Sequence, residues 1–139
     1  MLEKHTFAVD VVTPDGDVFT HADATMVVLH TVSGETGVMA NHTPFISALR
    51  ISEVKIENQT EGFEKLIAVN GGFAEFSNNL LTIVADAAER ADTIDVARAT
   101  AARERAERHL REAQNKRESE RAEAALSRAV NRIHAATGK

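Results

Sequence analysis

The fold of this chain is decided at residues 89–99, Glu-Arg-Ala-Asp-Thr-Ile-Asp-Val-Ala-Arg-Ala, where a β-rich part gives way to a helical part. Asp95 is suited to begin a helix, because its carboxylate can accept hydrogen bonds from the free backbone N–H groups two and three residues later. Ile94 and Ala99 then occupy the two positions that pack together as a hydrophobic staple. Taken alone, these residues predict an ordinary helix start at Asp95.

The composition limits what the 139 residues can form. This length corresponds to one ordinary domain, or to a small domain with an appendage. The absence of Cys excludes disulfides and thiolate metal sites, and the six His show no metal-ligand spacing, so we expect no metal site. There is no signal-peptide pattern and no run approaching about 20 apolar residues, so we expect a soluble intracellular protein.

The net charge of −5 conceals an asymmetry between the two parts of the chain. Residues 1–94 contain 5 Lys and Arg against 14 Asp and Glu, whereas residues 95–139 contain 11 against 7. An acidic first part and a basic tail suggest separate partners. We expect the tail to meet something anionic, such as nucleic acid, an acidic protein surface or a phosphate ligand.

Short apolar segments separated by turn residues fill the first part of the chain. Phe7, Val9 and Val11 alternate with other residues, as in a half-buried strand. Further strands are predicted over residues 18–20, 25–32, 45–49, 51–57, 63–69, 72–76 and 80–84. This spacing predicts a β-sandwich, a flattened barrel of about ten short strands, over residues 1–88.

The tail has the pattern of amphipathic helices. No Gly or Pro occurs between Asp95 and Thr137, and small apolar residues recur at spacings of three and four. Residues 114–116, Gln-Asn-Lys, interrupt that pattern, so we place the turn of an antiparallel helical hairpin there. The predicted fold is therefore α+β, with a sandwich followed by a hairpin over residues 89–139. A single long helix is the alternative.

The hairpin should form readily and dock weakly. It contains few large apolar residues, namely Val96, Leu110, Leu126, Val130 and Ile133. At about 1.5–3 kcal/mol for each fully buried large side chain, such a seam stabilises little once chain entropy is subtracted. Its many alanines instead supply helix propensity. We therefore expect a tail that can move.

Four arginines should gather on the hairpin. Arg98 and Arg105 are seven residues apart and Arg128 and Arg132 are four apart, so each pair shares a helix face. An antiparallel turn near residue 115 brings the two pairs together. Converging guanidinium groups favour an anion, and arginine suits polyphosphate. The alternative, which periodicity alone favours, is solvated arginines balanced by neighbouring acids, namely Glu104, Glu107 and Glu123.

Several stretches resemble the epsilon subunit of bacterial F-type ATP synthases, in the order and spacing of that family. They are residues 11–16, 33–37, 42–44, 68–73, 87–91 and 117–132. One departure is Ala40-Asn41, where relatives often carry Pro-Gly. The resemblance covers essentially the whole chain.

The resemblance implies a non-catalytic rotor subunit of the central stalk, peripheral to the cytoplasmic face of the bacterial cell membrane and held there through the complex. The sandwich would bind the gamma subunit and the c ring. The hairpin would permit turnover when folded against the sandwich. Extended along gamma towards the beta and alpha subunits, it would block ATP hydrolysis. ATP, alone or with magnesium, would be a regulatory ligand of the folded hairpin.

The resemblance also assigns site residues. Residues 94–99 look like the ATP-recognition motif of the family, and Glu89 carries over to another nucleotide-contacting position. The full set implied for ATP is Glu89, Ile94, Asp95, Arg98, Ala99, Arg105, Arg128 and Arg132. Glu35 and His42 are implied to face the c ring.

Two other classes of function compete with this interpretation. A nucleic-acid-binding module would use the basic hairpin, but that face has no interleaved aromatic residues and the chain is acidic overall. An enzyme built on the sandwich would need an acid–base constellation, and none is present. We therefore expect no catalytic residue and no nucleic-acid partner.

Overall fold

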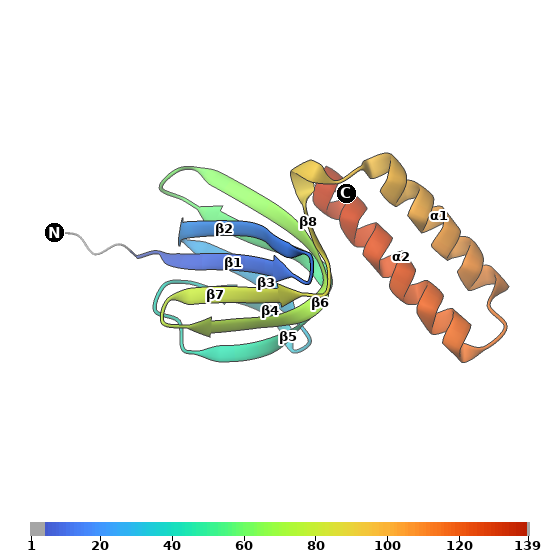
Figure 1. Ribbon diagram of the computed structural model, residues 1–139, viewed down its shortest axis with the longest axis horizontal. Helices are drawn as coiled ribbons and strands as arrows, with labels where there is room; N and C mark the ends of the chain where they lie inside the picture. Colours follow the sequence, from blue (N-terminus) through green and yellow to red (C-terminus); the bar gives the residue numbers. More distant parts are fainter. Residues whose placement is uncertain (1–4, 139) are drawn as a thin grey trace.

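The computed structural model describes residues 5–138 and has two parts, a β-sandwich and a helical hairpin (Figure 1). The α+β architecture predicted from the sequence is confirmed. The elements within residues 5–138 are β1 (Phe7–Thr13), β2 (Gly16–Ala24), β3 (Met26–Thr31), β4 (Gly34–Val38), β5 (Phe45–Asn58), β6 (Phe63–Ser77), β7 (Leu80–Ala85), β8 (Ala88–Arg90), η1 (Ala91–Thr93), α1 (Val96–Glu112) and α2 (Lys116–Thr137).

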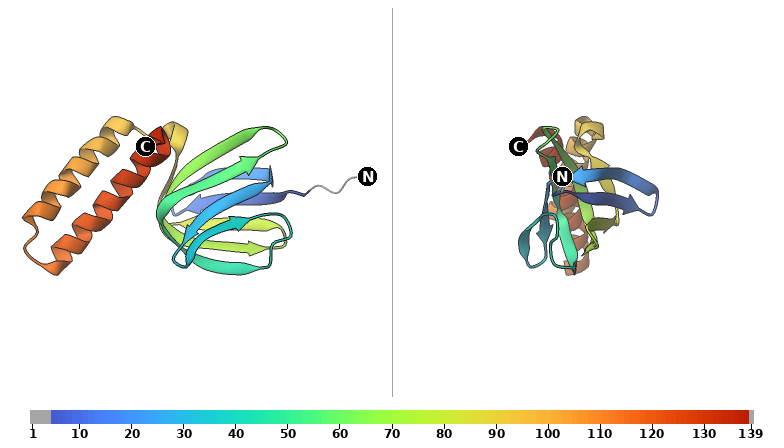
Figure 2. Two further views of the ribbon diagram at one scale, coloured as in Figure 1. Left: turned by 180° about the vertical axis from the view of Figure 1, so that it is seen from behind. Right: turned by 90° about the vertical axis from the view of Figure 1, so that its left-hand side faces the viewer.

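The strands form one hydrogen-bonded sheet that folds over on itself (Figure 2). Their order is β2-β1-β7-β6-β5-β3-β4, and β8 pairs separately with β6. Among these pairs, β1 with β7 is parallel and the others are antiparallel. The predicted division after residue 88 falls within β8, which pairs with the first half of β6.

The described strands number eight rather than about ten, because two predicted breaks are bends within long strands. β5, of 14 residues, continues through Arg50, and β6, of 15 residues, continues through Asn70. Gly71 and Gly72 have φ angles of 84° and 123°, and a Cβ at Gly72 would overlap the carbonyl oxygen of Val84. The first half of β6 pairs with β8 and the second half with β7, so each half serves a different part of the sheet.

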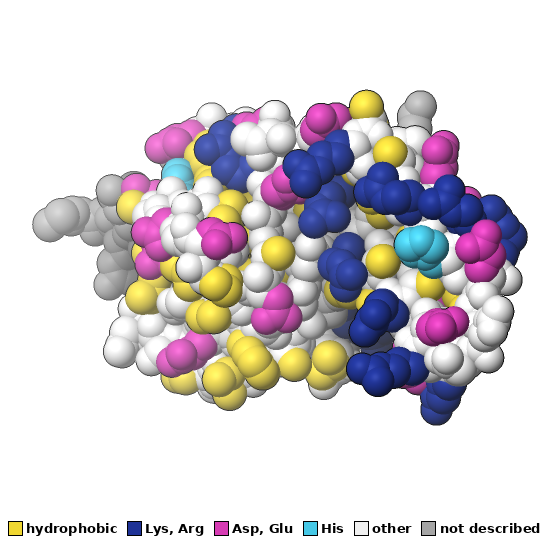
Figure 3. Space-filling model, turned by 45° about the vertical axis from the view of Figure 1, so that its right-hand side comes forward, with side chains coloured by type: hydrophobic (Ala, Val, Ile, Leu, Met, Phe, Trp, Pro, Cys, Tyr) yellow, Lys and Arg dark blue, Asp and Glu magenta, His cyan; other side chains and the backbone are white. Residues whose placement is uncertain are grey.

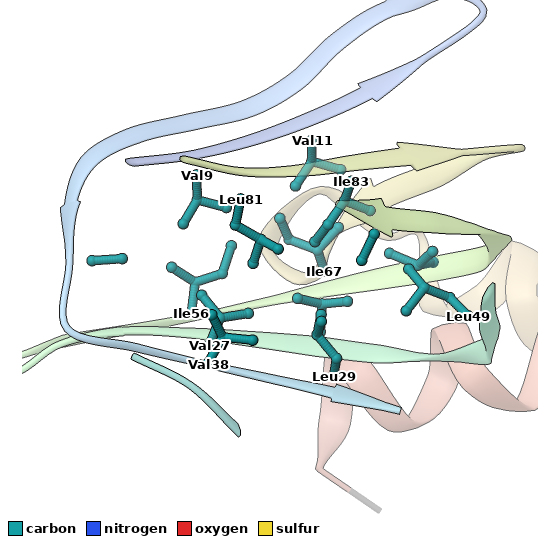
Figure 4. Packing of buried hydrophobic residues seen from close by; sticks show 14 of the residues in the cluster. Val9, Val11, Val27, Leu29, Val38, Leu49, Ile56, Ile67, Leu81 and Ile83 are labelled. Carbon is teal, nitrogen blue, oxygen red and sulfur yellow. The ribbon is translucent and has the colours of Figure 1, made fainter. Parts of the chain in front are cut away.

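The core of the sandwich is mainly aliphatic (Figure 4). Val9 and Val11 of β1 and Leu81 and Ile83 of β7 are fully buried, as the period-two alternation requires. Phe7 adds an edge-to-face contact with Phe76, with the ring centroids 5.7 Å apart. The buried cluster ends at Ala85, with the partly buried Ala88 packed against it. The sandwich core is therefore complete without the hairpin.

Local capping sets the ends of the two helices. Asp95 accepts a hydrogen bond from the backbone N–H of Arg98 at 3.0 Å, which confirms the predicted helix start. Asn115 caps α2 by accepting from the N–H of Glu118 at 2.9 Å. The Glu118 carboxylate in turn accepts from the N–H of Gln114 at 2.9 Å, which is the reciprocal bonding of a capping box displaced by one residue. The predicted hairpin turn is confirmed, and the single long helix is wrong.

The C-terminal half of α2 docks on the sandwich through small and polar side chains. Ala129, Asn131 and Ala135 are the buried residues of this half of the helix, and Asn131 Nδ2 donates to the carbonyl oxygen of Val69 at 3.3 Å. An ion pair between Arg132 and Glu89 and a hydrogen bond between His134 Nδ1 and Glu53 flank this contact. No large apolar side chain of α2 is fully buried within the described residues, in keeping with the weak docking expected from the sequence.

Candidate functional site

A groove runs along one face of the hairpin, between α1 and α2. Its proximal section, nearest the sandwich, has a volume of about 370 Å³ and is lined by Glu89, Thr93, Asp95, Arg98, Ala99, Ala102, Arg105 and Arg132. Its middle section, of about 260 Å³, is lined by Ala102, Arg105, Ala106, His109, Ala125, Arg128 and Arg132. The two sections adjoin each other, because they share Ala102 and Arg105 of α1 and Arg132 of α2. We call the whole feature the hairpin groove.

Helical periodicity places the charged side chains of the groove. Arg98 and Arg105 follow each other at a spacing of seven on α1, with Ala102 between them on the same face. Arg128 and Arg132 lie four residues apart on α2. Because alanine side chains are short, the space between the arginines stays open. Figure 3 shows Lys and Arg side chains gathered on this face of the hairpin, with His among them.

The groove has more positive than negative charge. Arg132 Nε donates to a Glu89 carboxylate oxygen at 3.0 Å, and this contact also joins α2 to β8. In the part of the chain that the structure describes, Arg98, Arg105 and Arg128 have no carboxylate within 4.0 Å. Guanidinium groups held close together without counter-charges repel one another, so an anion between them is favourable.

Seven of the eight predicted nucleotide-contacting residues line the groove, and Ile94 is the exception. Ile94 is half-buried, and its backbone N–H closes η1 by donating to Ala91 at 3.4 Å. Beside it, Arg90 and Asp92 form an ion pair of 2.8 Å. The hydrogen bonds from Arg90 lower the pKa of the Asp92 carboxyl. Ile94 therefore belongs to the connection between η1 and α1 that positions Asp95, rather than to the groove lining.

The two residues predicted to face the c ring lie at opposite ends of β4. Glu35 is exposed at the start of that strand, and His42 follows its end. Asn41, next to His42, has a left-handed φ of 67°. Its N–H donates to Asn79 Oδ1 at 2.6 Å, and Asn79 Nδ2 donates back to Asn41 Oδ1 at 3.0 Å. The loop that carries His42 is therefore fixed to the β6–β7 turn, whereas Glu35 belongs to another turn.

An exposed apolar row on the outer face of the sandwich was not found from the sequence. Phe73 is 55 % exposed and pairs with Ala48 on one side and with Val84, 51 % exposed, on the other. Val32, 56 % exposed, extends the row by donating its N–H to the carbonyl of Ala48. Yellow side chains gather along one side of the sandwich in Figure 3. The sequence of β7, Leu80–Ala85, could have indicated this row. It has apolar residues at both odd and even positions, so both faces of the strand carry apolar side chains.

Comparisons with known proteins agree with this architecture. Residues 6–91 match the family described as the ATP synthase delta/epsilon chain beta-sandwich domain, and residues 92–137 match its long alpha-helix domain. The chain belongs to the ATP synthase delta/epsilon chain family. It is 49 % identical over 137 residues to the ATP synthase epsilon chain of Pediococcus pentosaceus, covering 96 % of this chain and 97 % of the relative. It is 51 % identical over 131 residues to the ATP synthase epsilon chain of Lactobacillus gasseri, covering 91 % of this chain and 89 % of that relative.

Solved structures of ATP synthases share the fold of this epsilon-type subunit. A chain in the Euglena gracilis mitochondrial ATP synthase OSCP/F1/c-ring structure matches with a TM-score of 0.76 and 20 % identity, covering 91 % of this chain and 78 % of that one. A chain in the Tetrahymena thermophila central stalk/c-ring structure matches with a TM-score of 0.58 and 14 % identity, covering 98 % and 100 %. Neither helix within residues 5–138 has the length and apolar content that crossing a bilayer requires.

Proposed function

We propose that this epsilon-type subunit is a non-catalytic rotor component of the central stalk, and that its hairpin binds ATP while docked on the sandwich. The observation that carries the ATP part is the groove in which Arg98, Arg105 and Arg128, beside Arg132, have no carboxylate partner among residues 5–138. Polyphosphate supplies the negative charge that this arrangement lacks. Among residues 5–138, no Phe, Tyr or Trp ring lines these two sections of the groove, which disfavours the row of stacked bases by which proteins bind single-stranded nucleic acid.

The groove suggests a division of roles along the ligand. The four arginines contact the phosphates, whether ATP arrives alone or with magnesium. Glu89 and Asp95 repel phosphate and suit the N–H and O–H donors of the base and ribose. Both carboxylates lie in the proximal section, so the nucleoside end of ATP lies nearest the sandwich.

The sandwich provides the contacts with the rest of the rotor. The exposed row through Phe73 and Val84 fits the apolar centre of a protein interface, and we assign it to the gamma subunit. Glu35 and His42 face the c ring. The subunit is peripheral to the cytoplasmic face of the bacterial membrane and is held there through the complex.

Regulation follows from the weak docking of the hairpin. ATP that binds only the docked hairpin shifts the population towards it, by its differential affinity for the two states. The docked hairpin permits turnover. The hairpin extended along gamma reaches the beta and alpha subunits and blocks ATP hydrolysis.

Calorimetric titration of the isolated chain with ATP at fixed salt tests the site. Replacing Arg98 by Ala removes a charge-assisted contact of about 1.5–3 kcal/mol, so the affinity should fall about tenfold to more than a hundredfold. Arg111→Ala is the matched control, because Arg111 is an exposed arginine of the same helix that does not line the groove. Equal losses in both variants would indicate diffuse electrostatics, and no binding by the wild type would refute the ATP site.

A further inference from the structure

The hairpin groove continues beyond the residues assigned to ATP. Its distal section, next to the hairpin turn, has a volume of about 420 Å³ and is lined by His109, Glu112, Glu118, Arg121, Ala122 and Ala125. It shares the lining residues His109 and Ala125 with the middle section, so the three sections adjoin one another along the hairpin. From Arg98 to Glu112 this row of sections follows α1 for roughly 21 Å at 1.5 Å per residue.

The two ends of the groove resemble each other chemically. The proximal section has a carboxylate pair, Glu89 and Asp95, together with three arginines, Arg98, Arg105 and Arg132, the last of which pairs with Glu89. The distal section has a second carboxylate pair, Glu112 and Glu118, beside Arg121. At each end, one carboxylate also accepts a backbone hydrogen bond. Asp95 caps α1 by accepting from the N–H of Arg98, and Glu118 accepts from the N–H of Gln114 in the hairpin turn. Two alanines also line each end, namely Ala99 and Ala102 proximally and Ala122 and Ala125 distally.

Most of the positive charge lies between the two carboxylate pairs. Arg105 and Arg132 line both the proximal and the middle section, Arg128 lines the middle section, and His109 follows towards the turn. The Arg121 guanidinium has no carboxylate partner within 4.0 Å among residues 5–138, and the ATP site proposed above does not use it. The order along the groove is therefore carboxylates, cations and carboxylates.

Resting on that proposed ATP site, we propose that the hairpin groove binds a dinucleoside polyphosphate, with a nucleoside at each end and the phosphate chain between them. A bare polyphosphate fits less well, because Glu112 and Glu118 would repel its distal phosphates. A second nucleoside instead offers N–H and O–H donors to those carboxylates. Its base also offers an aromatic face on which the planar guanidinium of Arg121 stacks.

The test is calorimetric titration of the full chain with ATP, adenosine tetraphosphate and diadenosine tetraphosphate at one salt concentration. The wild type should bind diadenosine tetraphosphate about tenfold or more tightly than either mononucleotide. Arg121→Ala should abolish that advantage and leave the ATP affinity within about twofold. Arg111→Ala, an exposed arginine outside the groove, should preserve the advantage.

Each remaining outcome overturns the second nucleoside subsite. Equal affinity for ATP and diadenosine tetraphosphate would show that the distal section contributes nothing. Adenosine tetraphosphate binding as tightly as the dinucleotide would show that only phosphate is recognised. Equal weakening of ATP and the dinucleotide by Arg121→Ala would show a general charge effect. If ATP itself fails to bind, the proposed ATP site fails as well, whereas ATP binding without a dinucleotide advantage overturns this inference alone.

Discussion

Replacing Asn131 by Ala should release the hairpin from the sandwich without unfolding either part. Asn131 is 8 % exposed, and its amide donates to the backbone carbonyl of Val69 at 3.3 Å. The hydrogen bond exists only when the hairpin is docked, because the two residues are 62 positions apart on different parts of the chain. The higher helix propensity of Ala stabilises α2 equally in the docked and free states and cancels from the comparison.

The size of the effect follows from the lost hydrogen bond. If water reaches the Val69 carbonyl in the variant, the docked state loses about 0.5–1.5 kcal/mol of stability. If that carbonyl stays buried without a partner, the docked state loses about 1–3 kcal/mol. A change of about 1–3 kcal/mol lowers the ratio of docked to free hairpin by about 5- to 150-fold. The other buried residues of this half of α2 are Ala129 and Ala135, whose single methyl groups bury little apolar surface.

Paired spin labels would measure this release. The chain has no Cys, so Thr60→Cys on the sandwich and Arg117→Cys near the hairpin turn give two exposed and unique labelling sites. Double electron–electron resonance should show one main distance for the parent protein and a broad, longer distribution for Asn131→Ala. Ser127→Ala is the control, because Ser127 is exposed on the same helix. An unchanged distribution in Asn131→Ala would refute the view that a few polar contacts hold the hairpin.

Three further predictions concern the sandwich and the complex. Deleting residues 95–139 should leave a sandwich with a cooperative thermal transition and should raise ATP hydrolysis by the assembled enzyme; unchanged hydrolysis with assembly intact would mean that the tail does not inhibit. Gly72→Ala should destabilise the sandwich by about 1–3 kcal/mol or more, through backbone strain and a clash with β7. Gly62→Ala should destabilise it less, because a Cβ there meets open space, and equal chemical denaturation midpoints for the two variants would contradict this. Cysteines at Glu35 and His42 should crosslink to c subunits in the assembled enzyme, and crosslinks to beta alone would reject this orientation.

Features of the hairpin could be predicted because they depend on local chemistry. Asp95 and Asn115 cap helices through side-chain bonds that span three residues, so both helix starts are visible in the sequence. The gathering of Arg105 and Arg128 follows from helical period and hairpin register alone. The Glu89–Arg132 ion pair, in contrast, joins residues 43 positions apart, and no local pattern predicts such a pair. Only the family resemblance brought Glu89 into the candidate site.

Features of the sandwich that depend on distant partners were harder to predict. Arg50 and the glycines at 71 and 72 look like strand breaks in one dimension, but the sheet continues through them because each long strand finds partners on both sides of the bend. The outer apolar row was missed because a half-buried strand is expected to be polar on its outer face. Phe73 and Val84 break that expectation, as residues at a protein interface do.

Arg132 connects the proposed ligand to the docking of the hairpin, since it lines the groove and also pairs with Glu89 on β8. An anion that simply drew Arg132 away would leave the Glu89 carboxylate without its partner and would weaken docking. A nucleotide avoids this cost, because its base and ribose can donate to Glu89 while its phosphates contact Arg132. A ligand at about 100 times its Kd stabilises the state it binds by about 2.7 kcal/mol. That is comparable to the upper estimate of about 3 kcal/mol for the Asn131 hydrogen bond, so we expect occupancy of the proposed site to shift the equilibrium between the docked and the free hairpin.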